Sequence, residues 1–209
     1  MSRCVIRIGL FWTGAHLSTQ LDPEEWLTVF GIRWFSRTEG LHLAEVCHMG
    51  VAFEFDDGSR EIHEALFREG WRVKPFDKLE HFKSKDPQNV LILEWLDCGP
   101  EALVQSMYER SQSWVGMHYD NRLIGTFAIT RSLLGRSIGI SMRDDPLRLV
   151  CSEGASRLIF SGAPYWDFRP VGSCKRTDDD DGFECVTPQD ALNRFRCLKS
   201  AKLANLEFE

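Results

Sequence analysis

The sequence predicts an α+β fold in which an antiparallel sheet packs on helices, and three observations lead to this prediction. Residues 46–66 show the two-residue alternation and the tight turn of a β-hairpin. Residues 4–12 and 90–95 are short apolar runs of the kind that form buried strands. Residues 100–115 instead carry apolar side chains at the 3.6-residue spacing of a helix, and a second helix is expected from Cys151.

The composition and charge of the chain favour a globular protein and argue against nucleic-acid binding and membrane insertion. The chain has 209 residues, 43% of them hydrophobic and 11% aromatic, which predicts a single globular domain over residues 1–209. Its net charge of −6 argues against a nucleic-acid partner. No apolar run approaches the ~20 residues of a membrane span, and the N-terminal segment makes a poor signal peptide. Seven cysteines without a disulfide-like spacing favour a reducing compartment, the cytoplasm.

The turn at residues 56–58 sets the expected register of the hairpin. A three-residue loop ending in glycine pairs Glu54 with Arg60, which carry opposite charges. The same register makes His48 and Glu64 diagonal neighbours on one face, close enough for their side chains to meet. Because Glu64 has apolar neighbours on that face, we expect it to point inward and to need a partner. The alternatives are a solvated Glu64 and a histidine that serves only the core or the surface.

The remaining elements are expected from local signals. Pro100 begins a helix that ends at Gly116, with a core-facing stripe made of Leu103, Val104, Met107, Tyr108, Ser111, Trp114 and Val115. Thr187 as N-cap and Pro188 at the first helical position begin a last helix that runs to about Phe195. Further expectations are a helix from Asp22-Pro23, strands at 32–35 and 71–73, an irregular element at 117–120, a helix with turns in 123–142, and a mobile acidic loop at 173–184.

The stretch 150–160 places Cys151 at the expected N-terminus of a helix. The helix dipole lowers the pKa of a thiol in this position and populates the thiolate, which is the form that a nucleophile needs. A buried cysteine is also often a small, inert hydrophobe, and this stretch alone leaves that alternative open.

Five short motifs follow one another in an order seen in a known family: His48-x-Gly50-Val51, Ile62-His63-Glu64-Ala65, Tyr119-Asp120, Cys151-Ser152-Glu153 and Thr187-Pro188-x-Asp190. This order resembles that of the circularly permuted papain-like hydrolases related to NlpC-type cell-wall peptidases, in which the histidine strand precedes the cysteine helix. The resemblance extends from about residue 4 to residue 195. It implies a circularly permuted papain-like fold, with an antiparallel sheet or small barrel packed on helices that include the one beginning at the nucleophilic cysteine.

The resemblance also implies roles for individual residues. By motif, Cys151 would be the nucleophile, His48 the base, and Glu64 the third polar residue, which orients the imidazole. Tyr119 matches a tyrosine that precedes the cysteine helix in the family, and we expect it to support the substrate or the oxyanion. Glu153 matches a position with a structural role at the start of that helix.

The primary hypothesis is therefore a cysteine hydrolase, an amidase, peptidase or esterase, that works through a thioacyl intermediate and needs no cofactor. Its substrate would be a small molecule, a peptide or a lipid with an amide or ester bond. A lipid acyltransferase or thioesterase on the same scaffold is one alternative, and a non-catalytic binding module is another. Residues 122–148 and 173–184 depart from the family pattern, so the substrate class does not carry over.

A metal site is the remaining alternative, because four possible ligands lie close together in the sequence: His42, Cys47, His48 and His63. Their spacing matches no zinc pattern, and Cys47 and His48 point to opposite faces of a strand. Cys174 and Cys185 flank the acidic loop, which lacks the ligand spacing of a calcium loop. The sequence therefore predicts no metal.

Overall fold

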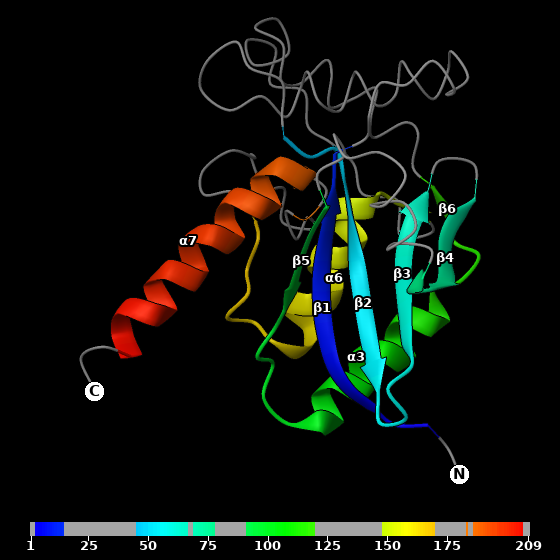
Figure 1. Cartoon of the computed structure of the whole chain (residues 1–209). Coiled ribbons are helices and arrows are strands. Elements are labelled where there is room, and N and C mark those ends of the chain that lie inside the picture. The colour runs from blue at the N-terminus through cyan, green and yellow to red at the C-terminus, as the bar shows by residue number, and fades with distance from the viewer. Residues whose placement is uncertain are drawn as a thin grey trace, which may run out of the picture.

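The structure, a computed structural model, describes residues 3–14, 45–66, 69–77, 91–119, 148–169, 183 and 186–206. These residues form a five-stranded antiparallel sheet, three helices and a short two-stranded pairing (Figure 1). The α+β class predicted from the sequence is confirmed.

The sheet has the strand order β4-β3-β2-β1-β5, and every neighbouring pair is antiparallel. Its strands are β1 (Val5–Thr13), β2 (His48–Phe55), β3 (Arg60–Leu66), β4 (Gly70–Pro75) and β5 (Leu91–Trp95). The strands expected in residues 4–12 and 71–73 are confirmed. The strand expected in residues 90–95 forms, but it is half-buried rather than buried, because β5 lies at one edge of the described sheet.

The hairpin of β2 and β3 has the expected register. Glu54 lies opposite Arg60 in the ladder, and the backbone N–H of Phe55 donates to the carbonyl of Ser59 over 2.9 Å. Gly58 closes the turn with φ 78°, a left-handed conformation that glycine adopts without a steric penalty. The three-residue loop therefore determines which side chains share a face, as the sequence predicts.

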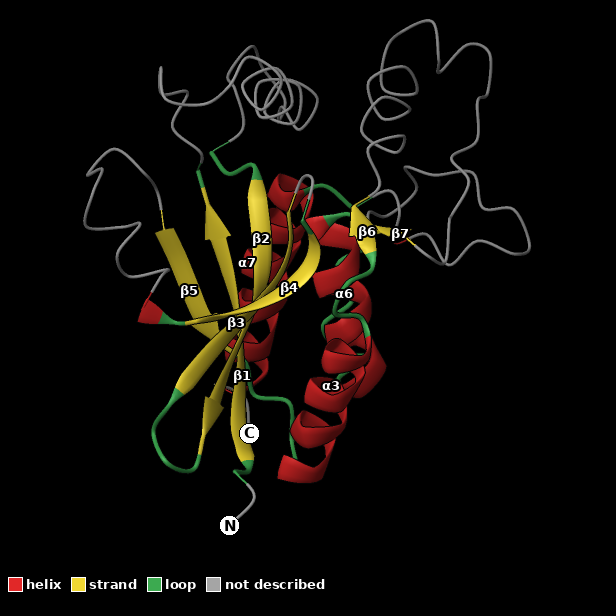
Figure 2. Cartoon of the chain, turned by 90° about the vertical axis from the view of Figure 1, so that its right-hand side faces the viewer, coloured by secondary structure: helices red, strands yellow, loops and turns green. Residues whose placement is uncertain are grey.

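Two helices lie against one side of the sheet, as Figure 2 shows. They are α3 (Glu101–Ser113) and α6 (Cys151–Gly162), and each contacts the sheet as well as the other helix. The core that they share with the sheet includes Leu10, Val51, Met107, Leu158 and Ile159. This packing brings the start of α6 against β2, the strand that begins at His48.

The expected stripe of α3 is only partly correct. Val104, Met107 and Ser111 are buried, whereas Leu103 and Val115 are 41% and 51% exposed. Leu103 is one residue before Val104 and therefore about 100° away around the helix. Val115 follows the last helical residue, so the helical period no longer determines where its side chain points.

The last helix, α7 (Pro188–Leu206), begins as predicted, with the N–H of Asp190 donating to the Thr187 hydroxyl oxygen over 3.1 Å. The predicted end near Phe195 is wrong. The helix continues for about three further turns because residues 196–206 contain neither glycine nor proline and consist largely of good helix formers.

The segment expected to be irregular at residues 117–120 contains a short strand, β6 (His118–Tyr119). It pairs in parallel with β7 (Arg148–Leu149), which ends two residues before Cys151. This pairing joins the end of the α3 segment to the start of the cysteine helix.

Several predictions fall outside the described residues: the helix and strand in 22–39, the elements in 123–142, the acidic loop, and Cys174 and Cys185. The single domain over the whole chain also stays a prediction. In the part of the chain that the structure describes, none of the helices combines the length and the apolar content that crossing a bilayer requires.

Candidate active site

Cys151 is the first residue of α6, and its side chain is buried. Val150 is the N-cap, and its backbone N–H donates to the Glu153 carboxylate over 3.3 Å. Glu153 thus satisfies a polar group at the start of the helix, which is the structural position expected for it. The result is a rigid first turn of α6 that fixes where the sulfur atom lies.

His48 is the first residue of β2, and the exposed fraction of its side chain is 17%. Its ring lies near that of Phe11, with 6.0 Å between the centroids. Phe11 in turn covers Gly50, where an added Cβ would lie 2.6 Å from the phenyl ring. The glycine of the His48-x-Gly50 motif therefore provides the room for the aromatic ring that flanks the imidazole.

Glu64 orients His48 from the neighbouring strand. The Nε2–H of His48 donates to the Oε2 atom of Glu64 over 2.8 Å. The other carboxylate oxygen, Oε1, accepts from Nε and Nη2 of Arg72 over 3.1 and 2.8 Å. Both oxygens of a carboxylate that is only 6% exposed are thus bound to cationic partners.

The imidazole of His48 also contacts the thiol of Cys151. Because Nε2 binds Glu64, we expect the remaining ring nitrogen, Nδ1, to serve the sulfur. Hydrogen bonding from the backbone at Met49 and Ser152 also lowers the pKa of the thiol. The structure thus brings Cys151, His48 and Glu64 together in the order thiol, imidazole, carboxylate.

The charges on Cys151, His48 and Glu64 stabilise one another. Burial on its own would raise the pKa of the Cys151 thiol, but the positive imidazole of His48 and the hydrogen bonds to the sulfur lower it. Burial would likewise lower the pKa of His48, yet the thiolate and Glu64 raise it to about 10. Burial opposes ionisation of Glu64 too, but His48 and Arg72 lower its pKa to about 2. Together these shifts favour the thiolate, the imidazolium and the carboxylate over the neutral forms of the three groups.

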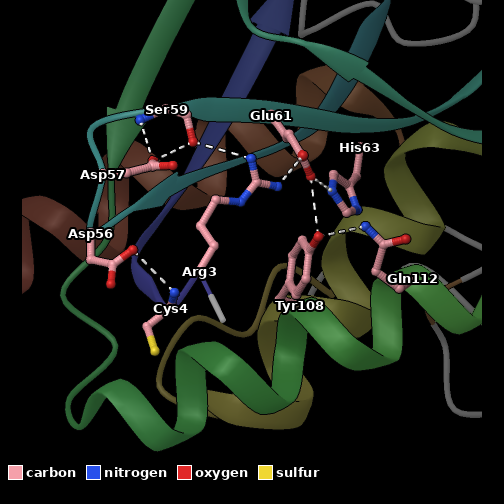
Figure 3. Close-up of polar contacts among 9 residues, drawn as sticks. All are labelled: Arg3, Cys4, Asp56, Asp57, Ser59, Glu61, His63, Tyr108 and Gln112. Carbon is pink, nitrogen blue, oxygen red and sulfur yellow. Dashed lines mark hydrogen bonds and ion pairs between the residues drawn. The ribbon is translucent and has the colours of Figure 1, made fainter. Parts of the chain in front are cut away.

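A second His–Glu pair on the same hairpin has a different setting. Figure 3 shows the Glu61 carboxylate between the guanidinium of Arg3, the hydroxyl of Tyr108 and the ring of His63. His63 is fully buried, and its Nδ1 lies 2.7 Å from the hydroxyl oxygen of Ser111 on α3. Burial lowers the pKa of His63, so this imidazole is neutral at pH 7. This pair connects the hairpin to α3, whereas the pair of His48 and Glu64 meets a thiol.

A second buried cysteine, Cys98, shows how burial alters the pKa of a thiol that lies outside the site. Burial, followed by the nearby charge of Asp97, raises the pKa of the Cys98 thiol to about 12. Cys98 is therefore an inert buried thiol, which is the state that the alternative interpretation assigns to Cys151. Cys151 is buried as well, but the pKa of its thiol moves in the opposite direction.

Comparison of the chain with protein-family models, with curated proteins and with solved structures found no match. Function is therefore inferred from the geometry and chemistry of the site.

The remaining predicted site residue, Tyr119, is buried in β6, where it pairs with Leu149. Its expected support of the substrate or the oxyanion stays a prediction. Among the described residues, no group of three or more histidine, cysteine, aspartate and glutamate side chains is arranged to hold a metal ion.

Arg72 is the residue of the site that sequence reasoning missed. It lies directly opposite Glu64 in the ladder of β3 and β4. A sequence signal for this pairing existed in principle, because a short loop ending before Gly70 would place Glu64 and Arg72, which carry opposite charges, across from each other on adjacent strands. The residues between Leu66 and Gly70 lack the typical sequence of such a turn, however, and give no register by themselves.

Proposed function

We propose that this chain is a cysteine hydrolase that cleaves an amide or ester bond, and that its fold is a circularly permuted papain-like fold. Cys151 is the nucleophile, His48 the general base and acid, and Glu64 the residue that orients the imidazole. The observation that carries the proposal is the contact between the Cys151 thiol and an imidazole whose other nitrogen is bound to a buried carboxylate.

Three features support this assignment over an inert thiol. The segments that meet are far apart in the sequence, and local structure alone does not bring a histidine strand to the start of a cysteine helix. The carboxylate lies on the far side of the imidazole, which is the arrangement of catalytic triads. The thiol is at the N-terminus of a helix, where the dipole stabilises negative charge.

Acylation would proceed from the ion pair. The Cys151 thiolate attacks the substrate carbonyl carbon, and the negative charge moves onto the carbonyl oxygen. The backbone N–H of Cys151 stabilises that oxygen, a contribution of roughly 3 kcal/mol for each such donor. Collapse of the intermediate breaks the bond to the leaving group, which takes the proton from Nδ1 of His48. The products are a thioester on Cys151 and a free amine or alcohol.

Deacylation reverses the roles of the same groups. Neutral His48 takes a proton from water through Nδ1, and the resulting hydroxide attacks the thioester carbonyl. The carbon–sulfur bond breaks, the acid leaves, and the ion pair of Cys151 and His48 is restored. Glu64 keeps the ring in the orientation that both steps need, since its hydrogen bond leaves Nδ1 directed at the sulfur.

The proposal is tested by trapping the acyl-enzyme. The protein is mixed with p-nitrophenyl acetate and with longer acyl esters, quenched in acid, and analysed by mass spectrometry of the intact chain and of its peptides. We expect one acyl group on the peptide that contains Cys151, together with release of free acid. In a parallel reaction with an added amine or alcohol, acyl groups found only on that acceptor would point to the acyltransferase alternative. If no ester acylates Cys151, the binding-module alternative is favoured and the proposal fails.

Arg72→Met is expected to lower kcat/KM for ester hydrolysis about ten-fold, a loss of about 1.4 kcal/mol of transition-state stabilisation. Without Arg72, the carboxylate of Glu64 keeps a single partner and holds the imidazole less firmly. Steady-state kinetics with p-nitrophenyl acetate measure the loss.

Arg60→Met is the matched control for this variant. Arg60 also places Nε and Nη2, at 3.0 and 2.9 Å, on one oxygen of a glutamate, Glu54, at the turn end of the same hairpin. We expect kcat/KM of this control to stay within about two-fold of wild type. Equal losses in the two variants would show that Arg72 acts only on the stability of the hairpin.

A further inference from the structure

The first turn of α7 binds the backbone just before His48. The side-chain oxygen of Gln189 accepts the N–H groups of Glu45 and Val46 over 2.8 and 3.2 Å. Gln189 is only 3% exposed, and its amide nitrogen donates to the side chain of Asn193 over 3.1 Å. The amide therefore has one orientation, with its oxygen toward the strand, since both backbone groups are donors.

The same segment also binds the residue after the nucleophile. The hydroxyl of Ser152 donates to the carbonyl oxygen of Val186 over 2.5 Å, and Ser152 directly follows Cys151 in the first turn of α6. Thr187 and Asp190 cap each other through the hydroxyl and carboxylate, 2.6 Å apart, which makes this turn rigid. Residues 186–190 thus form a bridge between the two chain segments that carry the reacting groups.

We propose that Gln189 is a positioning residue, which acts through the backbone at Glu45 and Val46 to hold the imidazole of His48 against the thiol of Cys151. The inference rests on the proposed hydrolase and adds the element that sets its geometry. Only one residue, Cys47, separates Val46 from His48, and its N–H donates to the Thr13 carbonyl on β1 over 3.0 Å. Gln189 and Thr13 thus hold consecutive backbone groups of this link, and we expect loss of the Gln189 acceptor to loosen the link and with it the imidazole.

The experiment compares alkylation of Cys151 by iodoacetamide, resolved by peptide mass spectrometry over a range of pH, in the full chain and its variants. Gln189→Met removes the acceptor at nearly the same volume, and Gln189→Glu keeps an acceptor for both N–H groups. Gln105→Met is the matched control. The side-chain oxygen of Gln105, on α3, accepts the N–H of Val5 over 3.2 Å, at the opposite end of β1 from the site.

We expect Gln189→Met to lower the alkylation rate of Cys151 at about pH 6 by between about 10- and 100-fold, because the imidazole no longer lies where it stabilises the thiolate. The pH at which the rate is half-maximal should rise. Gln189→Glu should restore the rate to within about three-fold of wild type, and Gln105→Met should keep it within about two-fold. Thermal unfolding of each variant shows that the chain is folded.

An unchanged pH dependence in a folded Gln189→Met variant would overturn the inference, as would an equal change in Gln105→Met. If Gln189→Met does not fold, Ser152→Ala breaks the other half of the bridge and should shift the pH dependence in the same direction; no shift there would also overturn it. The proposed hydrolase fails in a different way, because wild-type Cys151 would then react no faster than the exposed Cys197.

Discussion

Cys151→Ala is expected to abolish hydrolysis of p-nitrophenyl acetate, with a loss of about 10⁴-fold or more in kcat/KM, while the chain still folds. The thiolate is the atom that forms the acyl-enzyme, so nothing replaces it in the alanine variant. Cys151→Ser should be similarly inactive, because a serine hydroxyl beside the same imidazole is not ionised. Steady-state kinetics and thermal unfolding measure the two effects separately.

Cys98→Ala is the control for this variant. It removes a thiol that is also buried but whose pKa is raised to about 12. We expect a modest loss of stability and full activity. Full activity in Cys151→Ala, or equal losses in the two alanine variants, would remove the case for Cys151 as the nucleophile.

His48→Gln is expected to have the second largest effect, a loss of about 10²- to 10⁴-fold in kcat/KM. Glutamine still reaches Glu64 but neither takes nor gives a proton. In the wild type the raised pKa of His48 keeps the imidazolium charged until the pH rises through about 10. The ion pair that supports the thiolate is therefore present at neutral pH and is lost above that value, so activity should fall there. In His48→Gln the pKa of Cys151 should rise, and alkylation at neutral pH should slow.

His63→Gln provides the control, because it alters the other His–Glu pair of the hairpin. His63 is neutral and buried against α3, so its replacement should cost about 1–3 kcal/mol of unfolding free energy, measured by urea denaturation. The pH dependence of Cys151 alkylation should not change. A shift of that dependence in His63→Gln as large as the one in His48→Gln would contradict the separate roles given to the two pairs.

The register of the hairpin was predictable because one local feature determines it. The glycine at position 58 restricts the loop to three residues, and the loop length then decides every cross-strand neighbour. This is why the sequence alone placed His48 beside Glu64, the contact that the structure has at 2.8 Å. The start of α6 at Cys151 was predictable for a similar reason, since it depends on signals within one short stretch.

Other features depend on contacts between distant segments, and the sequence could not predict them. The hydrogen bond between Gln189 and the backbone before His48 joins residues about 140 positions apart, and no local sequence pattern predicts it. Arg72 needed a second register, that of β3 with β4, and the sequence that connects these strands has no distinctive turn signal. The half-buried state of β5 follows from its place at the edge of the sheet, and strand order is a property of the whole fold.

The alkylation rate of each thiol of the wild-type chain, followed as a function of pH, distinguishes a nucleophilic Cys151 from an inert one. We expect Cys151, although buried, to react faster than the exposed Cys197 at about pH 6, where an ordinary thiol is almost fully protonated. Its reactivity should fall only when the pH drops below the lowered pKa of the thiol. If Cys151 became reactive only near the pKa of an ordinary thiol, or reacted no faster than Cys197, it would not be the nucleophile proposed here.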